Sequence, residues 1–235
     1  MIAEHGSHQA EFRYLDPRMV DLLEAFGIDV VLDVGANRGQ FALELIRAGY
    51  LGRIVSFEPL SSAHAVLVEA SHRHPQWVVA ERCAISDRSG TAVLNVAGNG
   101  ESSSLLPMLA AHQAAAPAAR YVGSETVLVR RLDEAAADDV APAARPFLKL
   151  DVQGLEHRVL DGATDLLPRI AGVQAELNLA HLYEGDLLID EMLPRLQRLG
   201  FAAHWLVPGF TDRRSGRMLQ VDGIFFRESR TAGPA

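Results

Sequence analysis

The sequence predicts a doubly wound α/β domain with a mostly parallel seven-stranded sheet that ends in an antiparallel hairpin. Continuously apolar runs such as Val30–Val34 indicate strands that are buried on both faces, as in parallel sheets covered by helices. These runs alternate along the chain with segments of helical periodicity. The last apolar run, 221–226, follows the turn-rich segment 208–216, which leaves no room for a helix. A short connection of this kind favours antiparallel pairing.

The predicted elements follow one another in a regular order. An amphipathic helix comes first, because Asp16-Pro17 supplies an N-cap and a first-turn proline and Gly27 ends the helix. Strands are expected near residues 30–34, 53–57, 77–82, 146–151, 171–176, 201–206 and 221–226. Helices are expected near residues 39–48, 61–72, 155–166 and 187–199. We assign residues 1–29 to an N-terminal tail and the first helix, residues 30–228 to the α/β domain, and residues 229–235 to a disordered C-terminal tail.

The pattern changes between residues 84 and 146. Two short runs, 91–96 and 126–130, resemble strands, whereas the segment 98–124 is rich in glycine, serine and alanine. This segment is either a passive insertion or a lid over a ligand cleft, because long insertions in compact domains are often functional. The sequence leaves both alternatives open.

Composition excludes several classes of protein. The chain has 235 residues, which suits one large domain, and a net charge of −8, which does not suit a nucleic-acid binder. The single cysteine, Cys83, permits no intramolecular disulfide and fits a reducing compartment. The N-terminus has no apolar signal-peptide core, and no apolar run reaches the length of a membrane span. We therefore expect a cytoplasmic protein.

The turn after the first strand predicts a nucleoside cofactor. It reads Asp33-x-Gly35-Ala36-Asn37-x-Gly39, and the second strand ends in Glu58, a carboxylate placed to accept ribose hydroxyls. A dinucleotide fingerprint needs glycine where Asn37 stands, and the Asp33 carboxylate would repel a pyrophosphate but attract a cation. S-adenosylmethionine carries an ammonium and a sulfonium and fits that charge. The alternative is an ordinary strand-to-helix turn.

Polar residues also follow two later strands. Asp151 ends one strand, and Glu176 and Asn178 end the next, so these three side chains are candidate ligands of Mg²⁺. Asp151 is alternatively a carboxylate base beside a substrate hydroxyl, or the N-cap of the helix that starts near Leu155. His181 is the second candidate base. We expect six other histidines to be solvated: His5, His8, His64, His72, His74 and His112.

Six ordered motifs lie between Val30 and Phe226: Asp33–Phe41, Phe57-Glu58-Pro59, Ala84–Asp87, Ser102–Ser104, Arg131-Leu132-Asp133 and Leu148–Glu156. Together they resemble FkbM-type S-adenosylmethionine-dependent methyltransferases. The resemblance implies a class I (Rossmann-like) methyltransferase fold and methyl transfer to oxygen. It also implies that Gly35, Ala36 and Asn37 form the cofactor turn, that Glu58 binds the ribose, and that Ala84, Ile85 and Asp87 lie by the adenine. The chain departs from the family pattern at Gln153, where an acidic residue is common, and at Leu155.

We therefore expect an S-adenosylmethionine-dependent O-methyltransferase that acts on a sugar, glycan, glycolipid or natural product, with Mg²⁺ as a second candidate cofactor. One alternative is a nicotinamide-dependent oxidoreductase, which Asn37 and the lack of a Tyr-x-x-x-Lys motif disfavour. The other alternative is a non-catalytic methyltransferase-like partner subunit. The sequence is compatible with a homodimer as well as with a monomer. We expect no nucleic-acid partner.

Overall fold

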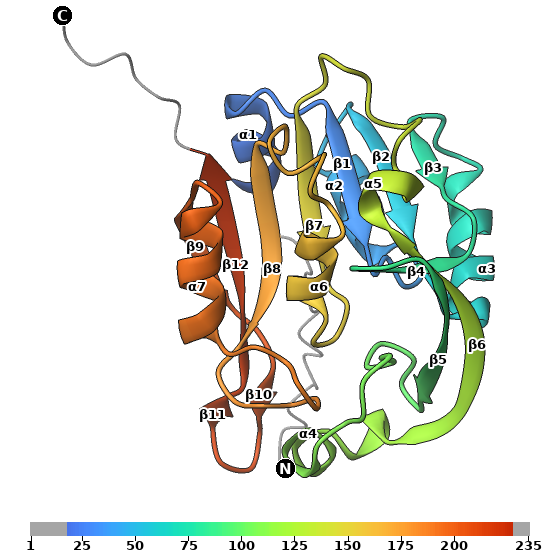
Figure 1. The fold of residues 1–235 in the computed structure, drawn as a ribbon, viewed down its shortest axis with the longest axis vertical. Helices are drawn as coiled ribbons and strands as arrows, with labels where there is room; N and C mark the ends of the chain where they lie inside the picture. Colours follow the sequence, from blue (N-terminus) through green and yellow to red (C-terminus); the bar gives the residue numbers. More distant parts are fainter. Residues whose placement is uncertain (1–17, 228–235) are drawn as a thin grey trace, which may run out of the picture.

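The computed structural model describes residues 18–227 and shows a mixed α/β fold built on a seven-stranded sheet (Figure 1). Across the sheet the strands are β3 (Trp77–Val79), β2 (Arg53–Phe57), β1 (Val30–Val34), β7 (Pro146–Leu150), β8 (Gly172–Asn178), β12 (Gln220–Arg227) and β9 (Phe201–Pro208). Within this sheet β12 is antiparallel to both of its neighbours, and the other recorded pairings are parallel. The predicted fold class and its final antiparallel hairpin are confirmed.

Helices cover both faces of this sheet, as the apolar strands require. In β1, the side chains of Val30, Leu32 and Val34 pack into one buried cluster, and that of Val31 packs into another. The first cluster includes residues of α5 (Leu132–Ala135), α6 (Glu156–Asp161) and α7 (Ile189–Arg198). The second includes residues of α1 (Arg18–Ala25), α2 (Gln40–Arg47) and α3 (Ser61–Ser71).

A second, three-stranded sheet accounts for the region in which the sequence pattern changes. Its strands are β4 (Cys83–Ser86), β6 (Tyr121–Arg131) and β5 (Gly90–Ala97), in that spatial order. The strand-like runs 91–96 and 126–130 lie within β5 and β6. The connection between them contains α4 (Ala110–Ala115) and the short 3₁₀ helix η1 (Pro117–Ala119), and it lies beyond the carboxyl ends of the parallel strands (Figure 1). The two-residue strands β10 (Thr211–Asp212) and β11 (Arg217–Met218) pair within the β9–β12 connection.

Two element boundaries were predicted wrongly. The helix expected over 155–166 ends at Asp161 with Gly162 as its C-cap, where only glycine fits because a Cβ would lie 2.0 Å from the carbonyl oxygen of Ser86. The Asp133 carboxylate then accepts hydrogen bonds from the backbone of Asp165 and Leu166. The strand expected over 77–82 ends at residue 79, since the chain leaves for the second sheet at 83.

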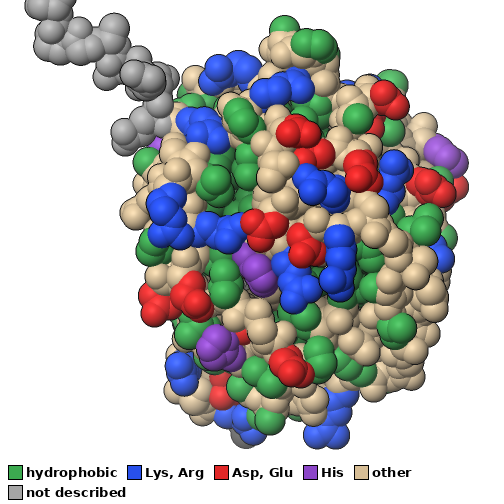
Figure 2. Space-filling model, in the orientation of Figure 1, with side chains coloured by type: hydrophobic (Ala, Val, Ile, Leu, Met, Phe, Trp, Pro, Cys, Tyr) green, Lys and Arg blue, Asp and Glu red, His purple; other side chains and the backbone are tan. Residues whose placement is uncertain are grey.

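Three predictions concern residues outside the described part of the chain. The expected N-cap at Asp16-Pro17 and the expected tails lie there in whole or in part. No helix within residues 18–227 is long and apolar enough to cross a membrane. Acidic and basic side chains are interspersed on the face of the molecule shown in Figure 2.

Candidate active site

Strand register places the polar strand ends in one row. Val34 pairs with Phe57 on one side and with Leu150 on the other, so Gly35, Glu58 and Asp151 leave the sheet at the same level. Leu150 pairs in turn with Ala175, and Glu176 pairs with Asp222 of the antiparallel strand β12. The row therefore extends along the carboxyl edge of the parallel strands, where ligands bind in open α/β sheets.

A cavity of about 930 Å³ lies over this edge. Side chains and backbone of the β5–β6 connection, including residues 99–105 and 115–118, form part of its wall. Eight of the site residues expected from sequence line the cavity: Gly35, Ala36, Asn37, Glu58, Ala84, Ile85, Asp151 and Glu176. Five others do not line it: Asp33, Gly39, Asp87, Asn178 and His181.

The first turn holds its shape through one glycine and one strained asparagine. A Cβ on Gly35 would lie 1.8 Å from the backbone oxygen of Asp151, so only glycine fits between β1 and β7. Asn37 has a positive φ of 48°, and its N–H donates to Oε2 of Glu58 at 2.8 Å. The N–H of Leu60 donates to Oε1 of the same carboxylate at 2.7 Å. Left-handed non-glycine residues persist where the surroundings fix them, as at ligand sites.

Gly39 and Asp87, which were expected at this end of the cavity, do not line it. Gly39 is needed for packing, because a Cβ there would lie 2.4 Å from the Trp77 ring. Asp87 follows β4 outside the cavity wall and accepts a hydrogen bond from Ser86 Oγ.

Asp33 is not the free negative charge that the sequence argument assumed. It is fully buried, and its Oδ1 lies 3.1 Å from Nζ of Lys149, its partner in the adjacent strand. Lys149 also lies 3.5 Å from Oδ2 of Asp151 and donates to the backbone oxygen of Gly35. Burial disfavours the charged amine, but these carboxylates outweigh burial and raise the pKa of Lys149. The lysine thus links the cofactor turn to the row of strand ends.

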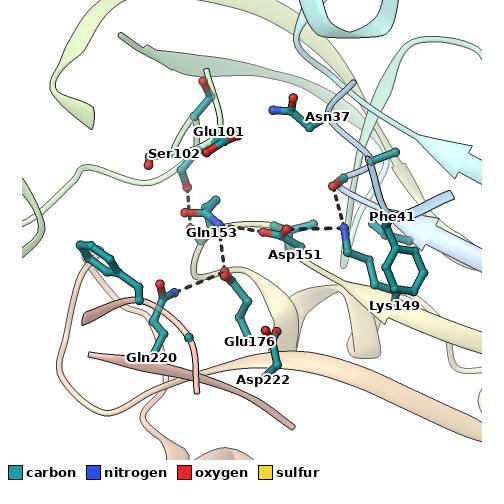
Figure 3. Close-up of a pocket in the computed structure, with 18 of the residues that line it drawn as sticks. Asn37, Phe41, Glu101, Ser102, Lys149, Asp151, Gln153, Glu176, Gln220 and Asp222 are labelled. Carbon is teal, nitrogen blue, oxygen red and sulfur yellow. Dashed lines mark hydrogen bonds and ion pairs between the residues drawn. The ribbon is translucent and has the colours of Figure 1, made fainter. Parts of the chain in front are cut away.

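The three predicted metal ligands do not come together. The Nε2 amide of Gln153 lies between the carboxylates, donating to Asp151 at 2.8 Å and to Glu176 at 2.9 Å (Figure 3). Asn178 instead donates to Asp186 and accepts from Gln220. Within residues 18–227 no group of three or more His, Cys, Asp and Glu side chains is arranged to hold a metal ion. The residues present therefore do not fit Mg²⁺.

Gln153 is itself held firmly. Its φ is 55°, which makes it, with Asn37, one of the two non-glycine residues of positive φ in the described chain. Its Oε1 accepts from Tyr183 at 2.6 Å, and its backbone oxygen accepts from Ser104 at 2.8 Å. Both the oxygen and the nitrogen of the Gln153 side-chain amide are thus hydrogen-bonded. The fixed amide in turn fixes the orientation of the Asp151 carboxylate toward the cavity.

Asp151 is not an N-cap. The residue before α6 is Leu155, which makes no side-chain cap, and the backbone N–H groups of Val152 and Gly154 donate to Glu156. With 37% of its side chain exposed, Asp151 faces the cavity between Gln153 and Lys149. Its carboxylate is therefore accessible to a ligand.

The structure places two histidines where the sequence did not predict them. His181 lies outside the cavity wall, where its Nδ1 is 2.6 Å from the buried Asp186, and this hydrogen bond raises the pKa of His181. His112, expected to be solvated, is only 3% exposed and lines the cavity. Burial lowers the pKa of His112 to about 4.

Four carboxyl groups at or near the cavity have raised pKa values. Removal from water raises the pKa of Glu58 and of Glu156 to about 7 and that of Asp222 to about 6. Burial, reinforced by the nearby charges of Asp151 and Asp222, raises the pKa of Glu176 well above its ordinary value. A raised pKa in the folded state means that the folded protein binds protons that the unfolded chain releases. Stability from these groups is therefore complete at low pH and is lost as the pH rises through the folded-state pKa.

We expect Glu176→Gln to stabilise the protein relative to wild type at pH 8 and to leave stability nearly unchanged at pH 5. At pH 5 the carboxyl is neutral like the amide, whereas at pH 8 only the wild type bears the cost of ionisation. The unfolding midpoint should differ by a few degrees, since about 1 kcal/mol shifts it by about 2–4 °C in a domain of this size. Thermal scans at both pH values measure this. The control Glu184→Gln changes an exposed carboxylate and should have the same unfolding midpoint as wild type at both pH values. If Glu176→Gln shifts the midpoint equally at pH 5 and pH 8, ionisation of Glu176 is not the cause of the shift.

Several residues of the cavity wall escaped the sequence analysis. Lys149, Asp222 and Gln220 line the cavity, and Lys149 and Asp222 interrupt apolar strands. A charged side chain inside a strand that is buried on both faces needs a partner, so these interruptions were the available signal.

The comparisons with known proteins agree with this architecture. Residues 33–202 match the family model described as the methyltransferase FkbM domain. No curated protein matches the sequence. TehB from Haemophilus influenzae superimposes with a TM-score of 0.50 at 10% identity, over 91% of this chain and 63% of that chain. This chain therefore spans less than two thirds of the length of TehB.

Two further solved structures are among the matches. Fibrillarin from Aeropyrum pernix, solved with natively bound S-adenosyl-L-methionine, gives a TM-score of 0.48 at 11% identity over 84% of this chain and 66% of that chain. The 1,6-didemethyltoxoflavin-N1-methyltransferase from Burkholderia thailandensis was solved with S-adenosylhomocysteine. It gives a TM-score of 0.45 at 12% identity, over 89% of this chain and 76% of that chain. At such identities the likeness concerns the fold, which is that of class I Rossmann-like methyltransferases.

Proposed function

The chain belongs to the FkbM methyltransferase family, and from this premise we propose that it transfers the methyl group of S-adenosylmethionine to a hydroxyl of a small-molecule acceptor. The acceptor class is a sugar, glycan, glycolipid or natural product. The observation that carries the proposal is one cavity in which Glu58, the turn at Gly35–Asn37 and Asp151 all form part of the wall.

The cofactor is proposed to lie at the β1–β2 end of the cavity. Glu58 ends β2 beside the turn, and the ribose hydroxyls of an adenosine would donate to such a carboxylate. Ala84 and Ile85 of β4 supply an apolar surface for the adenine. The backbone of Gly35 and Ala36 borders the same end, next to the strand that leads to Asp151.

Asp151 is the proposed general base. When bound, S-adenosylmethionine supplies an electrophilic methyl group on its sulfonium. Asp151 would accept the proton of the acceptor hydroxyl while the oxygen attacks the methyl carbon. Gln153 and Lys149 hold the two oxygens of this carboxylate from opposite sides, so its position is fixed before the acceptor arrives (Figure 3). His181, the other base expected from sequence, lies outside the cavity wall.

At pH 8, above the raised pKa of about 7 and therefore with Glu58 mostly ionised, we expect Glu58→Ala to weaken S-adenosylhomocysteine binding about ten- to a hundredfold, because hydrogen bonds to a charged acceptor contribute about 1.5–3 kcal/mol. Titration calorimetry measures the affinity. The control Glu69→Ala changes an exposed carboxylate on α3 and should bind like wild type. Since Glu58 also accepts two backbone N–H groups, thermal unfolding must show that the variant is folded. Unchanged affinity would remove Glu58 from the site, and tighter binding of a nicotinamide dinucleotide would overturn the proposed function.

A further inference from the structure

His112 occupies an unusual position in the cavity wall. It lies on α4, in the β5–β6 connection, and is 3% exposed. Its Nδ1 is buried and has no hydrogen-bond partner in the structure. Buried polar atoms are nearly always paired, so this nitrogen needs an explanation that packing does not give.

The surroundings of the ring are aromatic. The imidazole meets the Tyr183 ring edge to face, with centroids 5.2 Å apart, and the Phe210 ring at a tilt, also at 5.2 Å. A phenyl ring would make the same contacts without burying an unpaired nitrogen. The unpaired Nδ1 of His112 is therefore a cost to the folded chain alone, and a ligand that pairs with this nitrogen would remove that cost.

We propose that His112 binds a hydroxyl group of the methyl acceptor at a subsite where α4 and Phe210 together line the cavity, an inference that rests on the proposed function. The ring is neutral at physiological pH because burial lowers its pKa to about 4, so it can accept or donate one hydrogen bond without charge. A hydroxyl, which both donates and accepts, suits either tautomer.

The rest of the wall narrows the chemistry of this acceptor. Phe210 and Trp205 offer aromatic surface to the cavity. The carboxyl groups of Glu176 and Asp222 line the same cavity, and their raised pKa values favour the protonated forms, which can donate and accept hydrogen bonds with hydroxyl groups. The subsite therefore fits an uncharged polyol with an apolar face, such as a glycoside that carries an aromatic or aliphatic aglycone.

The test uses 4-nitrophenyl β-D-glucopyranoside as the probe and the full chain saturated with S-adenosylhomocysteine. Calorimetry compares wild type with His112→Phe, which keeps the aromatic contacts, with His112→Gln, which restores a hydrogen-bonding group, and with the exposed control His72→Phe. We expect His112→Phe to bind the probe about three- to tenfold more weakly, as the loss of one hydrogen bond implies, and His112→Gln to recover part of the affinity. Cofactor affinity should not change.

Two further readouts separate binding from structure. The unfolding midpoint of His112→Phe should equal or exceed that of wild type, because the variant loses an unpaired buried nitrogen. In NMR spectra of protein with ¹⁵N-labelled histidine, the resonances that are missing from His112→Phe belong to the His112 ring. The chemical shifts of these resonances should change when the probe binds to the wild type. Equal probe affinity in wild type and a folded His112→Phe would overturn the role of His112.

The outcomes also distinguish this inference from the proposed function. If S-adenosylhomocysteine binds but the probe does not, the assignment of an uncharged polyol to this subsite is wrong and the cofactor site stands. If S-adenosylhomocysteine itself does not bind, the proposed function fails.

Discussion

Replacing Lys149 with methionine is expected to destabilise the fold by about 3–5 kcal/mol, the penalty for leaving a buried charge without its partner. Asp33 is fully buried, and its Oδ1 has no hydrogen bond apart from the ion pair with Lys149. The hydroxyl of Ser56 donates a hydrogen bond to the other oxygen of Asp33, Oδ2, at 3.2 Å. Without the lysine, the Asp33 carboxylate would remain buried beside the Asp151 carboxylate. Urea unfolding monitored by circular dichroism measures the change.

A double-mutant cycle tests the cause of this loss. Asp33→Asn combined with Lys149→Met removes both charges, and we expect it to recover more than half of the stability lost in the single variant. The matched control, Arg53→Met, breaks an exposed ion pair with Asp139 and should cost no more than about 1 kcal/mol. If the double variant is as unstable as Lys149→Met, the buried charge of Asp33 is not the reason.

Asp151→Asn is expected to lower kcat by about 10²–10⁴-fold, the usual contribution of a general base, while S-adenosylhomocysteine affinity changes little. The substitution keeps the size of the side chain and removes its ability to take a proton. Because the Gln153 amide fills the space between Asp151 and Glu176, activity should be the same with and without a chelator. Turnover with labelled S-adenosylmethionine, once an acceptor screen has identified a substrate, measures both effects.

The control for this prediction is Asp190→Asn, an exposed change on α7 that should leave kcat unaltered. Loss of wild-type activity in chelator, restored by Mg²⁺, would contradict the metal-free arrangement. Normal turnover in Asp151→Asn would remove the proposed base and leave the cofactor site intact.

The main sheet was predictable because each of its strands is marked by a local signal. An apolar run such as 30–34 shows burial on both faces without reference to any other part of the chain. Once β1 and β7 are adjacent, their register places Gly35 beside Asp151. The position of the cavity therefore follows from sequence patterns together with the topology of parallel sheets.

The contacts that decide the roles of individual side chains were not predictable in this way. Asn178 and His181 follow a core strand like Asp151 does, yet both turn toward Asp186 because its buried carboxylate gathers donors from its own loop. Likewise, the alanine-rich sequence around His112 gives no sign of burial, which arises from packing against Tyr183 and Phe210. Such contacts depend on how distant connections meet.

The origin of the cavity wall has a consequence for how acceptor preference can change. Glu58 and the Gly35–Asn37 turn belong to strand ends, whereas much of the opposite wall comes from two connections, 99–118 and 209–213. Side chains of these connections can be mutated without altering the strand pairing of the main sheet. Diversification of substrates by evolution, or by directed mutagenesis, is thus decoupled from cofactor recognition. Libraries confined to these two connections are the economical route to new acceptors on this scaffold.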